Sequence, residues 1–375
     1  MGKYKLINNV LGWIVFAIAS TVYLMTMEPT ASFWDCGEFI SSAYKLEVGH
    51  PPGAPFFMLT ANLFTQLASD PSTVAKMVNT MSALFSGLTI LFLFWSITHL
   101  ARKIMVKDGE EASLGQMITV MGSGLVGALA YTFSDTFWFS AVEGEVYAYS
   151  SLFTAVVFWL ILKWEAVADK PHADRWIVLI AYLMGLSIGV HLLNLLCIPA
   201  IVLVYYYKKF PNPTMKGTLV ALLASFAIVA LMMYGVVQGL VEVCGYFELL
   251  FVNVLGMPYN SGVFAYVIIV AGVLIWSIWE TMRDEIHPTR MKIAFILSVV
   301  LIGIPFIGSG YVLAVILTAA LSLYLFKSKK VDIKTLNTIL VCLMVVVVGY
   351  SSYALTLIRA TADTPMNQNA PSDIF

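Results

Sequence analysis

Two carboxylates and a histidine lie close together in the segment SFWDCGEFISSAYKLEVGHPPGAPFF, which runs from Ser32 to Phe57. Asp35 and Glu38 are three residues apart, so a helix that begins near Ser32 would carry both on one face. An ionised carboxylate can act as a general base, and a helix N-terminus keeps a nearby carboxylate ionised. Ser32 and Asp35 also have the spacing of a helix capping box, which is a purely structural role. We therefore predict a short surface helix whose acids form a polar site, a cap, or both.

A histidine follows this predicted helix in the segment GHPPGAPFF. Proline disfavours helical geometry in the residue before it, so His50 is expected outside any helix. Pro51, Pro52 and Gly53 then form a rigid corner, and an apolar run from Ala54 to Leu67 follows. Such a corner would present His50 beside the surface helix. The alternative is a loop histidine at the level of the lipid headgroups.

A second polar segment, YTFSDTFWFSAVEGEVYAY, contains Glu143 and Glu145. Two residues that are two apart do not share a helical face, so these acids are expected to point in different directions. Glu145 is expected about one turn inside an apolar span, where an ionisable side chain is costly and indicates function. Aromatic anchoring at the membrane interface accounts for the surrounding tyrosines and tryptophan equally well.

Three further residues are candidates for binding. His191 and Asn194 in SIGVHLLNLL share a helical face at a predicted turn, where a structural role is an equal alternative. Arg359 follows the last apolar run, and a guanidinium can pair with phosphate or extend to the membrane interface. The chain has no P-loop, Rossmann fingerprint, HExxH or Cys/His cluster, so we assign no residue to a metal.

The composition shows which elements must position these residues. Of the 375 residues, 60% are hydrophobic and 11% are charged, whereas soluble domains carry about 25% charged residues. This indicates an all-α, polytopic membrane protein. Runs of about 20 apolar residues predict eleven spans, at residues 7–27, 76–100, 116–134, 143–163, 176–190, 192–207, 217–240, 263–281, 291–304, 310–326 and 335–357. The net charge of −1 gives no signature of nucleic-acid binding.

The distribution of lysine and arginine predicts the orientation. With a cytoplasmic N-terminus, all but three of the 21 basic residues fall in inner segments, as the positive-inside rule requires. The three on the outer side are Lys45, Lys76 and Arg359. Asp35, Glu38 and Glu145 then also lie on the outer side. We predict a membrane domain over residues 1–358 and the start of an outer soluble region over 359–375, which we interpret as truncated.

The segments PTASFWDCGEFISSAYKLEVGHPPGAPFF, FSDTFWFSAVEGEVYAYSSLF and GLSIGVHLLNLL resemble the outer-facing motifs of a protein O-mannosyltransferase-like family. This family was long described only as a domain of unknown function. It is similar in organisation to the C-type glycosyltransferases, membrane enzymes that take sugar from a polyprenyl-phosphate donor. The resemblance covers nearly the whole chain.

The resemblance implies transfer of a sugar, expected to be mannose, to Ser or Thr hydroxyls of an exported protein. Asp35 matches the catalytic acid of the first outer loop, with Glu38 as its helper. Glu38 or Glu145 would bind sugar hydroxyls or orient the base, and Arg359, His50 or Lys45 would bind the leaving phosphate. His191 and Asn194 complete the candidate substrate-binding set. The lipid-linked sugar is the donor, no other cofactor is assigned, and the role of a divalent metal is left open.

Two other functions fit the sequence. A transporter or flippase of lipid-linked sugars would need ionisable groups along a path through the membrane, and such groups are scarce within the predicted spans. A non-catalytic membrane scaffold is the third alternative. The expected partners are membrane lipid, lipid-linked sugar and an exported acceptor protein. The expected location is an inner membrane of plasma-membrane or endoplasmic-reticulum type, with the active face periplasmic or lumenal. The sequence does not define an oligomeric state.

Overall fold

The computed structural model describes residues 2–107, 109–308, 311–328, 331–362 and 364–368. These residues form α-helices joined by short 3-10 and π-helical segments, which confirms the prediction of an all-α polytopic membrane protein. The chain divides into two compact units, which are described separately. Residues 363 and 369–375 of the predicted outer region lie outside the described residues.

Apolar helices account for all of the predicted spans. By length and composition, eight helices in the described part of the chain could cross a membrane: Gly2–Thr26, Pro71–Met105, Leu114–Thr132, Val146–Val167, Leu192–Lys209, Met215–Val254, Ser261–Glu280 and Ile333–Ala360. Shorter apolar helices cover Pro55–Thr65, Arg175–Ile188 and Tyr311–Lys327. Each of the eleven predicted spans coincides with a helix, and the span at 291–304 coincides with the 14-residue helix Pro288–Leu301.

The first unit holds residues up to Trp176, Leu186–Cys197 and the described part of Ser352–Ala370. Its helices are α1 (Gly2–Thr26), α2 (Cys36–Lys45), α3 (Pro55–Thr65), η1 (Pro71–Thr73), α4 (Val74–Met105), α5 (Leu114–Thr132), α6 (Asp135–Ala141), α7 (Val146–Val167), η2 (Leu192–Cys197) and α16 (Ala354–Ala360). Tyr23, Phe94 and Phe137 form part of a buried core between α1, α4, α5 and α6. The Tyr23 hydroxyl donates to the Thr132 carbonyl at 2.9 Å.

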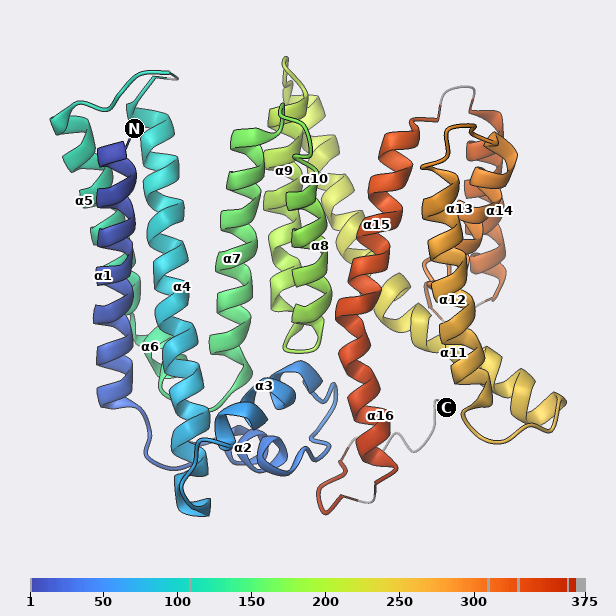
Figure 1. The fold of residues 1–375 in the computed structure, drawn as a ribbon, viewed down its shortest axis with the longest axis horizontal. Coiled ribbons are helices and arrows are strands. Elements are labelled where there is room, and N and C mark those ends of the chain that lie inside the picture. Colours follow the sequence, from blue (N-terminus) through green and yellow to red (C-terminus); the bar gives the residue numbers. More distant parts are fainter. Residues whose placement is uncertain (1, 108, 309–310, 329–330, 363, 369–375) are drawn as a thin grey trace. The chain divides into compact units, whose positions relative to one another are not determined.

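All eight predicted site residues lie in this first unit. Figure 1 shows the start of α1 at one end of the unit and α2 and α3 at the other end. Lys3 and Lys5 begin α1, and Arg102 and Lys103 lie in the last turn of α4, which packs against α1. The loops that carry the acids lie at the opposite end from this basic group.

The second unit holds Ile177–Gly185 and Ile198–Ser351 in the described part of the chain. It contains most of α8 (Arg175–Ile188), then α9 (Ile198–Lys209), α10 (Met215–Ala230), η3 (Leu231–Gln238), α11 (Gly239–Leu249), η4 (Leu250–Val254), α12 (Ser261–Glu280), α13 (Pro288–Leu301), α14 (Tyr311–Lys327) and α15 (Ile333–Tyr350). Here Gly239 packs against the backbone of Gly303, and a Cβ on Gly239 would lie 2.3 Å from that carbonyl oxygen.

A buried carboxylate joins two helices of the second unit. Glu280, at the end of α12, is fully buried and forms an ion pair with Arg290 of α13. The Trp276 indole donates to the same carboxylate at 2.9 Å. A buried charge requires such partners, so this group fastens α12 to α13.

Candidate functional site

The predicted surface helix exists, and it begins later than expected. Helix α2 starts at Cys36, and Asp35 is its N-cap residue without a side-chain capping bond. The predicted capping box between Ser32 and Asp35 is therefore wrong, because both residues precede the first helical turn. The backbone of Asp35 is still near-helical, and its carbonyl accepts the Phe39 amide at 2.9 Å. Asp35 is exposed, so its carboxylate is free of the helix end that it was expected to cap.

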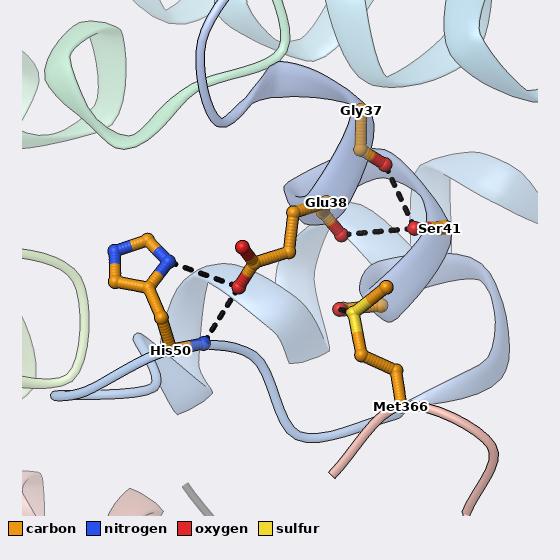
Figure 2. A network of polar contacts seen from close by, with 6 residues as sticks. Gly37, Glu38, Ser41, His50 and Met366 are labelled. Carbon is orange, nitrogen blue, oxygen red and sulfur yellow. Dashed lines mark hydrogen bonds and ion pairs between the residues drawn. The ribbon is translucent and has the colours of Figure 1, made fainter. Parts of the chain in front are cut away.

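Glu38 and His50 form the centre of the site, as Figure 2 shows. Oxygen Oε1 of Glu38 accepts the His50 backbone amide at 2.6 Å and lies 2.9 Å from His50 Nδ1. A Cβ on Gly49 would stand 2.6 Å from that oxygen, so any larger residue at this position would displace the Glu38 carboxylate. The predicted position of His50 outside any helix is confirmed. The carboxylate thereby fixes both the main chain and the ring of the histidine.

The corner after His50 leads into α3, which is hydrogen-bonded to the end of α2. The Pro51–Pro52 peptide is cis, and the Gly53 amide donates to the His50 carbonyl at 2.8 Å. Helix α3 follows, and the side-chain amide of Asn62 donates to the carbonyls of Ala43 and Tyr44 at the end of α2, at 2.8 and 3.1 Å. The Phe39 ring meets the His50 ring edge-on, with 5.7 Å between centroids. The short α2 is therefore held at both ends.

Glu143 and Glu145 gather at the same place as Asp35, contrary to the prediction that they point apart. That prediction assumed a helix, whereas residues 142–145 form bends between α6 and α7. Glu145 is the N-cap residue of α7, with an extended backbone, and does not lie a turn inside the span. Glu143 is 3% exposed, and the Ser32 and Cys36 side chains lie near enough to lower the pKa of its carboxyl group against the effect of burial.

Asn79 of α4 fixes the two acidic loops together. Its side-chain amide donates to the carbonyls of Glu28 and Thr30 at 2.6 and 3.0 Å. A Cβ on Gly144 would lie 2.9 Å from the Asn79 side-chain oxygen, so the second loop lies directly against the same residue. The Glu28 amide also donates to the Val142 carbonyl at 3.0 Å. These bonds set the separation of the loops.

Burial and neighbouring acids raise the pKa values of several groups near Asp35. Burial, together with the charges of Glu143 and Asp35, raises the pKa of Glu145 to about 7, and His50 opposes this rise. Burial also raises the pKa of Glu143. Burial and the neighbouring acids, Glu143 first, raise the pKa of the Cys36 thiol to about 12. Cys36 is thus a protonated hydrogen-bond donor, and Glu145 changes its charge near neutral pH.

Asp35, Glu38 and His50 could together hold a metal ion. One ligand atom from each lies within 4.8 Å of the others. Sequence motifs predicted no metal ligand here, because His50 follows Glu38 by 12 residues and matches none of the close histidine and cysteine spacings of known metal motifs. The return of the loop from α2 to His50 creates the group.

Arg359 and Lys45 lie at the far end of α2. The Arg359 guanidinium donates to the carbonyls of Leu46 and Lys45 at 2.6 and 3.2 Å, which links α16 to the end of α2. The Lys45 side chain is exposed. The structure therefore gives Arg359 a backbone-binding role, and its assignment to the donor phosphate stays a prediction.

His191 and Asn194 occupy the predicted turn and have different surroundings. Nitrogen Nδ1 of His191 accepts the Leu193 amide at 3.1 Å, and its ring lies 5.5 Å from the Tyr147 ring at the start of α7. Asn194 is fully buried and donates to the Ser187 hydroxyl at 3.0 Å. Asn194 therefore joins α8 to η2, whereas His191 lies beside Tyr147 at the start of α7.

The fold and the site define an integral membrane protein with a compact acid–histidine site on loops between its helices. Comparison with known sequences narrows this class. The model of the family described as "Protein O-mannosyl-transferase TMEM260 N-terminal domain" matches residues 35–214, from Asp35 to beyond Asn194. Residues 35–214 are therefore similar to a protein O-mannosyltransferase-like family, in agreement with the resemblance found in the motifs.

Two curated proteins support the same relationship. "Protein O-mannosyl-transferase TMEM260" of Mus musculus is 28% identical over 174 residues, which are 46% of this chain and 22% of that protein. "Protein O-mannosyl-transferase tmem260" of Dictyostelium discoideum is 25% identical over 187 residues, 48% of this chain and 21% of that protein. The matched segment thus spans about a fifth of the length of these relatives. No solved structure matches the chain with significance.

Proposed function

We propose that the chain is a membrane glycosyltransferase that moves mannose from a polyprenyl-phosphate donor to Ser or Thr hydroxyls of an exported protein. The observation that carries this proposal is the grouping of Asp35, Glu38 and His50 inside the segment that matches the family. The names of the relatives supply mannose and the protein acceptor. The polyprenyl-phosphate donor comes from the resemblance in the motifs.

In this proposal Asp35 is the base. Its exposed carboxylate would accept the proton of the acceptor hydroxyl as the hydroxyl oxygen attacks the anomeric carbon. The bond between that carbon and the phosphate oxygen breaks, and the phosphate leaves with the bonding electron pair. A single displacement of this kind inverts the anomeric configuration. The reaction draws its energy from the sugar–phosphate bond and needs no nucleotide.

The other candidate residues take supporting roles. Glu38 holds His50 through two contacts, so the imidazole is oriented before the donor arrives. Glu145 lies near enough to Asp35 to feel its charge and would bind a sugar hydroxyl. We place the site on the periplasmic or lumenal side, since the basic residues at the opposite end of the first unit favour a cytoplasmic location there.

The test measures transfer of labelled mannose from polyprenyl-phosphate mannose to protein. The assay uses membranes that contain the full chain, with exported proteins from the same organism as acceptors. Asp35→Asn removes the base and keeps the side-chain volume, so we expect a loss of about 10²- to 10⁴-fold. Asp135→Asn is the matched control, because Asp135 is an exposed acid in the first turn of α6.

An Asp35→Asn variant that transfers mannose at the wild-type rate would overturn the assignment of Asp35 as the base. A wild-type chain that moves labelled lipid-linked mannose between leaflets and transfers none to protein would favour the flippase alternative. Normal amounts of both variants in the membrane fraction are the required control for insertion.

A further inference from the structure

The donor atoms of Asp35, Glu38 and His50 have the chemistry of a divalent-cation site, and one donor atom from each residue lies within 4.8 Å of the others. Carboxylate oxygens and imidazole nitrogens are ligands for ions such as Mn²⁺ and Zn²⁺, with bonds of about 2.0–2.2 Å in the case of Zn²⁺. Two neighbouring ligands at right angles on one ion are then about 3 Å apart. Glu38 Oε1 and His50 Nδ1 are separated by 2.9 Å. An ion could therefore bind both atoms at their present separation, once the imidazole ring turns so that the Nδ1 lone pair faces the ion.

The site is held in this arrangement by the protein itself. The His50 backbone amide fixes the Glu38 carboxylate, and Gly49 leaves room for it. The Glu38 and His50 side chains are 16% and 37% exposed, so both are partly withdrawn from solvent, while Asp35 is exposed. Three protein ligands of this kind leave positions open for water or substrate, as catalytic metal sites require.

The charge around the site is an independent argument for a cation. The charged groups that act on Glu145 are Glu143 and Asp35, which raise its pKa, and His50, which lowers it. An anionic sugar-phosphate would be repelled by these carboxylates. Arg359 donates to two backbone carbonyls at the other end of α2. A positive charge is needed beside the acids if a phosphate is to approach them.

We propose that Asp35, Glu38 and His50 bind one divalent transition-metal cation, which receives the phosphate of the donor. This inference rests on the proposed function for the identity of the phosphate, while the cation site can be tested alone. When the cation binds, the Nδ1 lone pair of neutral His50 faces the ion and the ring proton resides on Nε2. One oxygen of Asp35 binds the ion and the other stays available as the base.

The test uses Mn²⁺ as the probe and the full chain purified in detergent micelles. The electron paramagnetic resonance signal of free Mn²⁺ decreases when the ion binds, so a titration gives both affinity and stoichiometry. We expect one Mn²⁺ per chain that Zn²⁺ displaces. Glu38→Gln and His50→Gln each remove one ligand and are expected to weaken binding by more than about tenfold, since loss of even an outer-shell partner costs 10- to 100-fold.

Gly49→Ala separates a metal site from a merely acidic surface. This variant keeps every charged group, but its Cβ would stand 2.6 Å from Glu38 Oε1 and displace that ligand. We expect weaker Mn²⁺ binding in Gly49→Ala and unchanged binding in Asp135→Asn. Equal binding by wild type, Glu38→Gln and Gly49→Ala would overturn the proposal, and so would a wild type that binds no Mn²⁺ and no Zn²⁺. Matching elution profiles exclude misfolding as the cause.

The experiments distinguish a failure of the proposed cation site from a failure of the proposed transferase function. A chain that transfers mannose after its ions have been removed by a chelator, and binds none on titration, would overturn the cation site and leave the proposed function intact. A chain that binds one Mn²⁺ through Glu38 and His50 but transfers no mannose would support the site and overturn the proposed function.

Discussion

At the scale of single residues, the site depends on close contacts that side-chain chemistry alone does not reveal. A Cβ on Gly49 would stand 2.6 Å from Glu38 Oε1, so a larger residue there would move the carboxylate away from His50. Glu145 is half-buried at the N-terminus of α7. Burial and the charges of Glu143 and Asp35 raise its pKa. Its protonation is therefore linked to the stability of the folded chain.

Glu145→Gln tests this linkage. Burial and the neighbouring acids raise the pKa of Glu145 in the folded protein from its ordinary value of 4.5 to about 7. The folded state thus binds the proton more tightly, and the stability from this group is complete below about pH 4.5 and lost as the pH rises through 7. We expect Glu145→Gln to raise the midpoint of thermal unfolding at pH 8 and to change it little at pH 4.5, both in the presence of a chelator. The same shift at both pH values would contradict the prediction.

At the scale of elements, the sequence predicted the helices well and their ends less well. Periodicity located α2, apolar run length located a helix at each predicted span, and the i, i+3 spacing placed Asp35 near Glu38. Glu143 and Glu145 were misjudged, because the fourth span was predicted to begin at residue 143, whereas α7 begins at Val146 and both acids precede its first turn. The pairing of His50 with Glu38 also depends on the return path of a loop, which periodicity cannot give.

The contact between α16 and α2 gives a second prediction. Arg359 holds the end of α2 by two hydrogen bonds, and the Val48 amide donates to the Met366 carbonyl at 3.0 Å beside it. Arg359→Met removes both side-chain bonds and should cost about 1–3 kcal/mol of local stability. We expect faster hydrogen exchange at residues 43–48. Arg359→Lys should restore less than half of the protection, because lysine lacks the forked donor.

A phosphate-binding Arg359 would behave differently. If its main role is to bind the donor, Arg359→Met should raise the KM for polyprenyl-phosphate mannose without changing exchange at residues 43–48. Exchange that is unchanged in Arg359→Met would therefore contradict the structural role of the residue.

At the scale of the whole molecule, the proposed orientation can be checked chemically. Cys36, Cys197 and Cys244 are buried and Cys342 is partly buried, so the wild type should react slowly with a membrane-impermeant maleimide. Thr136 and Lys170 are exposed, and the charge distribution predicts opposite sides for them. In sealed vesicles with the outer face outward, Thr136→Cys should be labelled at once and Lys170→Cys only after permeabilisation. The reverse pattern would overturn the orientation.

The contacts between the two acidic loops have a consequence for folding during synthesis on the ribosome. The Glu28 amide donates to the Val142 carbonyl, and Glu143 acts on the pKa of the Cys36 thiol, yet more than a hundred residues separate these partners in the sequence. At a ribosomal speed of about 5–20 residues per second, the first loop waits roughly 5–20 s for the second. During that interval Cys36 is an unshielded thiol on a nascent chain. Helper proteins or redox conditions that act on the unfinished loop would thus affect the yield of the finished site.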